Sequence, residues 1–112
     1  MIEEKYMRVL VMFDMPTQSK EDRKHGTRFR QQLLKEGFMM LQFSVYMRIC
    51  KGAASANAQI NRLEGKLPPK GHVRAIVLTE KQFDSMRLLL GKASAQETKL
   101  APKELSLFDG LL

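Results

Sequence analysis

The sequence predicts a single α+β domain in which an antiparallel sheet carries two helices on one face. The chain has 112 residues, which suits one domain. The run Tyr6 to Phe13 is almost wholly apolar, as is typical of a strand buried on both faces and therefore central in its sheet. Two segments with helical spacing alternate with further strand-like runs. The resulting order is strand, helix, bent strand or strand pair, helix, strand, or βαββαβ.

The first strand should end at Asp14-Met15-Pro16-Thr17, because proline cannot extend the hydrogen-bonded ladder. Ser19 or Thr17 can cap the helix that follows. We expect this helix to run from about Lys20 to Glu36 and to stop at Gly37 as its C′ residue.

The faces of this first helix differ sharply in character. At about 100° per residue, Phe29 and Leu33 share a narrow apolar stripe with Gly26. The opposite side carries cations on two adjacent rows with few acids between them. They could be an ordinary solvated face or a surface that binds phosphates. One row holds Lys20, Lys24, Arg28 and Lys35, together with Gln31, and the other holds Arg23 and Arg30.

The strand-like segment from Phe38 to Ile49 is either one bent strand or two short strands that meet near Gln42-Phe43-Ser44. Ser55 or Asn57 could open a second helix. This helix would place Ile60, Leu63 and Leu67 at helical spacing and end at Pro68-Pro69-Lys70-Gly71.

Three further elements are predicted after the second helix: a strand over His72 to Thr79, a helical turn over Thr79 to Phe83 and a short strand over Met86 to Leu90. The βαββαβ order is the ferredoxin-like signature, which puts both helices on one face of the sheet. Because the strands are apolar on both sides, the other face should be bare and apolar. We therefore expect a homodimer formed through the sheet.

The chain divides into a ferredoxin-like domain at 1–90, a polar linker at 91–103 and a C-terminal strand or tail at 104–112. The tail is apolar again at Leu105, Leu107 and Phe108. In a monomer these residues have no obvious place, so we expect them to contact a partner, for example by adding an edge strand to a neighbouring sheet.

Composition favours an anionic partner. Nineteen Lys and Arg against twelve Asp and Glu give a net charge of +7 and a pI near 9.8. Nucleic acid is the first expectation for so basic a domain, although excess charge can also serve solubility alone. No apolar run can span a bilayer, and the first residues carry acids instead of a secretory apolar core. Cys50 is the single cysteine, which excludes an internal disulfide and a Cys-rich zinc cage. These features predict a soluble, cytoplasmic protein without membrane contact.

Asp14 is the best candidate for chemistry. It follows a buried strand, where a rigid sheet can fix a polar group, although capping of the turn is the commoner reason for an aspartate there. No glycine-rich phosphate loop, GxSxG or HExxH motif is present, and His25 and His72 are expected at the surface. Mg²⁺ usually takes one or two carboxylates with phosphate oxygens and water. A twofold axis near the strand ends would bring two Asp14 side chains together as such a site.

Three segments in this order resemble the Cas2 family of CRISPR-associated proteins, in particular the versions of type II systems. They are VLVMFDMPT, followed by the basic helix, then LLKEGFMMLQFSVYMRI, and GHVRAIVLTEKQF. The resemblance covers about residues 6–90. It implies a ferredoxin-like homodimer whose C-terminal strands are exchanged across the interface.

The resemblance also implies two roles. One is a Mg²⁺-dependent endonuclease that cleaves RNA or double-stranded DNA, with Asp14 matching the position of the metal ligand. The other is a bridge between two dimers of the Cas1 integrase, which holds the middle of a new spacer duplex. Ser44 and Tyr46 match the family's strand motif, and Arg28 lies where some relatives have a functional arginine. Met40 stands where some nuclease-active relatives have another arginine.

Three hypotheses therefore remain at this point. The leading one is a homodimeric adaptor for spacer acquisition that binds duplex DNA. The second is a metal-dependent nuclease that acts on RNA or DNA by itself. The third is a regulatory ferredoxin-like dimer that binds no nucleic acid.

Overall fold

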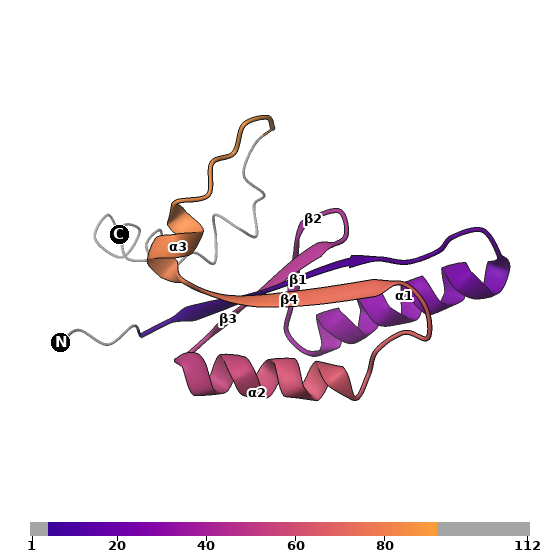
Figure 1. The fold of residues 1–112 in the computed structure, drawn as a ribbon, viewed down its shortest axis with the longest axis horizontal. Coiled ribbons are helices and arrows are strands. Elements are labelled where there is room, and N and C mark those ends of the chain that lie inside the picture. Colours follow the sequence, from indigo (N-terminus) through magenta and orange to yellow (C-terminus); the bar gives the residue numbers. More distant parts are fainter. Residues whose placement is uncertain (1–4, 92–112) are drawn as a thin grey trace, which may run out of the picture.

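A computed structural model describes residues 5–91 and confirms the α+β class (Figure 1). The four strands form one antiparallel sheet in the order β2-β3-β1-β4, so the apolar first strand lies inside it, as predicted. The arrangement is that of a ferredoxin-like fold. The elements along the chain are β1 (Met7–Asp14), α1 (Lys20–Lys35), β2 (Met39–Gln42), β3 (Val45–Cys50), α2 (Ala53–Glu64), β4 (His72–Thr79) and α3 (Glu80–Asp84).

Helices α1 and α2 lie on one face of the sheet and cover the main core (Figure 1). Alternate residues of β1 point toward them, and Val9 and Val11 are completely buried. The predicted stripe of α1 faces the sheet, where the Phe29 ring meets Phe13 edge-on at 5.3 Å between centroids. Ser19 caps α1 by accepting a hydrogen bond from the backbone of Asp22, which confirms one of the two predicted caps.

Glu36 joins the end of α1 to α2. Its carboxylate is almost buried and lies 3.0 Å from Arg62 and 2.5 Å from Lys66. Gln59 donates a further hydrogen bond to Glu36 at 3.2 Å and accepts one from Arg48. These contacts fix the two helices against each other on the sheet.

The opposite face of the sheet is only partly bare, which corrects the sequence-based expectation. The short helix α3 lies across one end of it (Figure 1). Arg8, whose side chain is completely buried, pairs with Glu80 at 3.0 Å and stacks 4.0 Å from the centroid of the Phe83 ring. Phe83 also packs on Leu10 and Met47. Beyond α3 the face stays open, with Met12 38% and Ile76 46% exposed.

The segment 38–49 forms two strands, which confirms the second of the two predicted alternatives, since Ser44 takes a left-handed conformation with φ 65° and breaks the ladder. Other boundaries differ from the predictions. Neither Ser55 nor Asn57 opens α2, which starts at Ala53 after Gly52 with no side-chain cap. Leu67 follows the end of α2 and is half exposed.

The segment Met86–Leu90 is not a strand, and its leucines project from the molecule, with Leu90 93% exposed. It forms no ladder with either edge strand of the sheet, β2 or β4. The predicted tail residues Leu105, Leu107 and Phe108, and the linker beyond Gly91, lie outside the described residues. Within 5–91, no helix is both long and apolar enough to cross a bilayer.

Candidate nucleic-acid interface and carboxylate site

Asp14 closes β1 directly opposite the first residue of β4. The antiparallel register pairs Asp14 with His72. The backbone N–H of His72 donates to Asp14 Oδ1 at 3.0 Å, and the imidazole Nδ1 lies 2.9 Å from the same oxygen. The two side chains are 76% and 74% exposed, so the pair stands at the surface, in an open hollow that Met12, Phe13 and Arg74 also line.

The surroundings of Asp14 favour its charged form. The side-chain hydrogen bond with His72 is the main cause that lowers the pKa of Asp14, and the positive charge of Arg74 acts in the same direction. The carboxylate is therefore ionised at neutral pH. Both hydrogen bonds use Oδ1, so Oδ2 has no partner among the described residues.

Gly71 allows this close pairing. Its φ is +100°, a conformation that glycine adopts without strain. A Cβ at this position would lie 2.3 Å from the backbone oxygen of Asp14. The absence of a side chain therefore lets the start of β4 approach the end of β1.

The Asp14 carboxylate fits a divalent cation only as one ligand among several. An exposed, ionised carboxylate with one free oxygen suits Mg²⁺, which accepts one or two carboxylates when phosphates and water supply the other ligands. Within residues 5–91, no three His, Cys, Asp or Glu side chains are grouped as a metal cage. Among the described residues, one chain thus offers Asp14 as a single carboxylate for such an ion.

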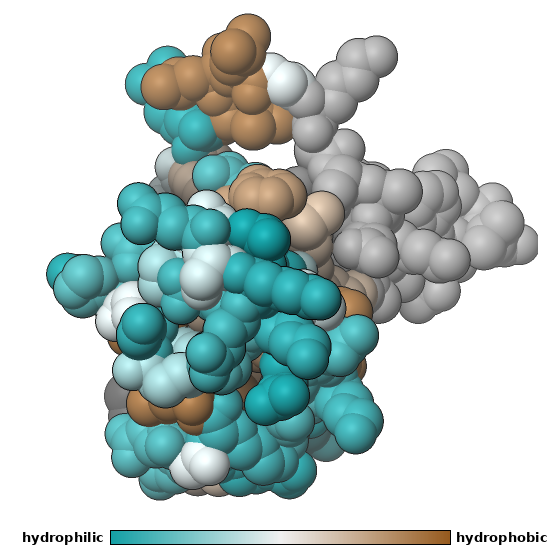
Figure 2. Space-filling model, turned by 90° about the vertical axis from the view of Figure 1, so that its right-hand side faces the viewer, coloured by the Kyte–Doolittle hydropathy of each residue, from teal (hydrophilic) through white to brown (hydrophobic). Residues whose placement is uncertain are grey.

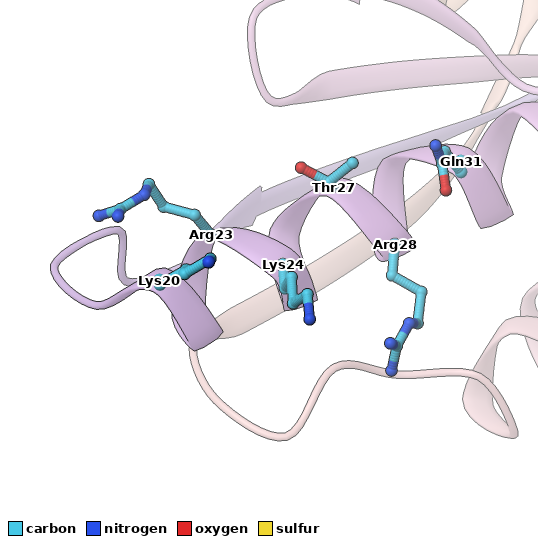
Figure 3. Close-up of a pocket in the computed structure, with 6 residues that line it drawn as sticks. All are labelled: Lys20, Arg23, Lys24, Thr27, Arg28 and Gln31. Atoms are coloured by element: carbon cyan, nitrogen blue, oxygen red, sulfur yellow. The ribbon is translucent and has the colours of Figure 1, made fainter.

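The predicted basic residues of α1 divide into two groups. Lys20, Lys24, Arg28 and Lys35 are exposed and form no ion pair or hydrogen bond in the described part of the chain. Figure 3 shows Lys24 and Arg28 projecting from the same side of the helix, below Thr27. The first three of these cations line one shallow hollow together with Arg23, Thr27 and Gln31. The end of the molecule at which α1 begins is largely hydrophilic (Figure 2).

Arg23 and Arg30 have structural partners instead. Arg23 donates to the backbone oxygens of Thr17 and Gln18, which ties down the loop before α1. The guanidinium of Arg30 lies between two rings, 5.7 Å from the centroid of Phe13 and 5.6 Å from that of Phe43. Sequence periodicity puts both arginines on the basic side but cannot show these contacts.

The other residues singled out in the sequence differ in their burial. Tyr46 is buried and stacks on Phe13, so it supports the end of β1 from inside the core. Met40 is 45% exposed on β2. Cys50 is buried, and burial raises the pKa of its thiol, which disfavours the reactive thiolate.

Known proteins place the chain in a family. The family described as "CRISPR associated protein Cas2" matches residues 7–86. The chain belongs to the Cas2 family. A protein of Campylobacter jejuni named "CRISPR-associated endoribonuclease Cas2" is 55% identical over 109 residues, covering 97% of this chain and 76% of the relative.

Two further relatives carry the same name. The Acidovorax ebreus protein is 48% identical over 102 residues, covering 91% of this chain and all of the relative. The Ligilactobacillus salivarius protein is 46% identical over 86 residues, covering 77% and 85%. The Cas2 match contains the described carboxylate site and all of α1, which confirms the resemblance found in the sequence.

Proposed function

We propose that this Cas2-family chain serves CRISPR spacer acquisition as a homodimer that binds double-stranded DNA along α1 and bridges dimers of the Cas1 integrase. The observation that carries the proposal is the group of four exposed cations on α1 that no acid neutralises among residues 5–91. Lys and Arg in such a row bind successive phosphates and release counterions. This role places the protein in the cytoplasm.

The homodimer is supported by the outer face of the sheet. Met12, Ile76 and the leucines of Met86–Leu90 leave apolar side chains exposed there and beside it. Figure 2 shows the exposed apolar side chains of the segment that follows α3, at the top of the molecule. A second copy on this face would cover them and leave both α1 helices on the outside. The tail residues Leu105, Leu107 and Phe108 remain our candidates for contact with the second copy or with the integrase.

Charge reversal on α1 tests the DNA-binding role. The double variant Lys24→Glu/Arg28→Glu should bind a duplex of about 30 base pairs more weakly, and the log–log slope of affinity against salt should fall by ~0.9 for each phosphate that the variant no longer neutralises. Fluorescence anisotropy at several salt concentrations measures both. The control Lys51→Glu/Lys81→Glu changes the net charge equally at exposed positions outside α1. An equal decrease in affinity in the two variants would contradict a site on α1.

A second candidate function is Mg²⁺-dependent cleavage of RNA or DNA, which is favoured by the exposed, ionised Asp14 and by the name endoribonuclease that the relatives carry. We propose that two Asp14 carboxylates, one from each copy, hold one Mg²⁺. The ion, when bound, would orient water and offset charge on the phosphate. His72 holds the Oδ1 atom of Asp14 and keeps the carboxylate charged, which leaves Oδ2 available as a ligand.

Asp14→Asn tests this second function. The variant keeps the size of the side chain but weakens it as a ligand. It should lose cleavage of RNA and duplex DNA in Mg²⁺, and the wild type should lose the same activity in chelator. Gel assays of both proteins, purified in parallel, measure the rates. Equal residual cleavage by the two proteins would identify a contaminant and reject the mechanism.

A further inference from the structure

Phe43 is an aromatic residue that no part of the described core uses. It lies in the turn between β2 and β3 and is 80% exposed, which is unusual for a ring of this size. The next residue, Ser44, has φ 65° and accepts a hydrogen bond from the backbone of Phe13 at 3.1 Å. The turn is therefore fixed to the end of β1, one residue before Asp14.

The ring of Phe43 is held in place by a stack of side chains. The guanidinium of Arg30 lies within about 6 Å of the ring centroids of both Phe43 and Phe13. Phe13 in turn contacts Phe29 and Tyr46 in the core. At Gly26 a Cβ would come within 3.2 Å of the Arg30 guanidinium, so the helix has its smallest residue where this stack passes. The exposed ring is thus linked through Arg30 to the aromatic cluster of the core.

We infer that Phe43 and Arg30 form a base-stacking site for an unpaired nucleotide of RNA, near the end of β1 that carries Asp14. This inference rests on the nuclease function proposed for Asp14. An exposed aromatic face can stack with any base, and a neighbouring guanidinium adds a charge that attracts the phosphate. A base in a continuous duplex is stacked on its neighbours and does not present its face. The site therefore favours single-stranded segments, while the exposed cations of α1 recognise backbone alone.

The test compares Phe43→Ala and Phe43→Tyr with the wild type in chelator, so that no cleavage occurs. The probes are a 12-nucleotide single-stranded RNA that contains 2-aminopurine and a blunt RNA duplex of equal length. We expect Phe43→Ala to bind the single strand roughly tenfold more weakly and Phe43→Tyr to bind it as the wild type does. Wild type should quench the 2-aminopurine, Phe43→Ala should not, and duplex affinity should stay the same in all three.

Leu34→Ala is the matched control, because Leu34 is also exposed and apolar but has no ring on which a base could stack. Single-strand affinity and quenching that do not depend on Phe43 would overturn the inference and leave the nuclease proposal intact. Failure of the wild type to bind either RNA would overturn both. Sedimentation of each variant shows whether a second copy of the chain, and not a nucleotide, covers the Phe43 ring. If Phe43→Ala converts a dimer to monomers, the ring belongs to the interface between copies and the inferred stacking site is contradicted.

Discussion

His72 is a positioning residue for Asp14 in the proposed nuclease. Its two contacts to Oδ1 orient the carboxylate and hold it in the ionised form. Partners of metal ligands contribute about 10- to 100-fold to metal affinity or activity. We expect His72→Ala to lower the cleavage rate by that factor and to raise the Mg²⁺ concentration needed for half-maximal activity, measured by titration with the metal.

The Mg²⁺ titration separates positioning from a general loss of structure. A variant that is only less stable would have a lower rate without a change in the half-maximal Mg²⁺ concentration. His72→Asn should recover part of the wild-type behaviour, because its amide can donate to Asp14. Unchanged rate and Mg²⁺ dependence in His72→Ala would contradict the assignment.

The sequence singles out Asp14 because a strand end is visible in a hydrophobic run, but it leaves His72 as an isolated surface residue. Their pairing follows from register: the last residue of β1 meets the first residue of β4 only once the sheet is assembled. The ends of both strands are predicted correctly, so this contact could have been found by aligning them as antiparallel neighbours. Arg23 binds carbonyl groups of the loop before α1, and Arg30 contacts Phe43 in the turn between β2 and β3. Helical periodicity predicts neither contact, because both partners lie outside the helix.

Glu36 makes the packing of α1 on α2 sensitive to acid. Hydrogen bonds from Lys66 and then from Gln59 lower its pKa from 4.5 to about 2. A carboxyl group whose pKa is depressed in the folded state stabilises the fold above the unfolded value. That contribution should therefore be complete above about pH 4.5 and should disappear as the pH falls toward 2.

Glu36→Gln tests this contribution. Melting temperatures between pH 6 and pH 2 should fall more steeply for the wild type than for the variant, because the variant has no charge to lose. Glu64→Gln is the control, since Glu64 is exposed on α2 and forms no ion pair within residues 5–91. Parallel curves for the wild type and Glu36→Gln would show that the contact between the helices does not depend on charge.

The elements are predicted more accurately than their ends. The start of α1 is visible because Ser19 precedes a helical pattern, and Thr79 marks α3 in the same way. The start of α2 is hidden because Gly52 offers no side-chain cap, so the polar residues Ser55 and Asn57 are the better candidates by sequence. The strand predicted at Met86–Leu90 has the apolar character of a strand but pairs with no strand among the described residues.

The assembled molecule should be a dimer through the open part of its sheet. Ile76 lies on that face and is 46% exposed. A charge there would be buried without a partner in the proposed interface, which is strongly unfavourable. We expect Ile76→Glu to sediment as a monomer at micromolar concentration while the wild type sediments as a dimer.

Leu34→Glu provides the comparison for the dimer. Leu34 is 56% exposed on α1, away from the outer face of the sheet, so this variant should remain a dimer. A monomeric wild type, or a dimer that persists in Ile76→Glu, would contradict the proposed interface. A monomeric wild type would also exclude an Asp14 site shared between two copies.

The missing side chain at Gly71 has a consequence for how the protein tolerates variation. Any other amino acid would bring its first carbon into the carbonyl group that closes β1, so the start of β4 would have to retreat and take His72 with it. A library that randomises this codon should give folded proteins whose core is intact but whose carboxylate stands without its neighbour. Engineering of the chain must therefore leave this one codon unchanged if the pairing of His72 with Asp14 is to be kept.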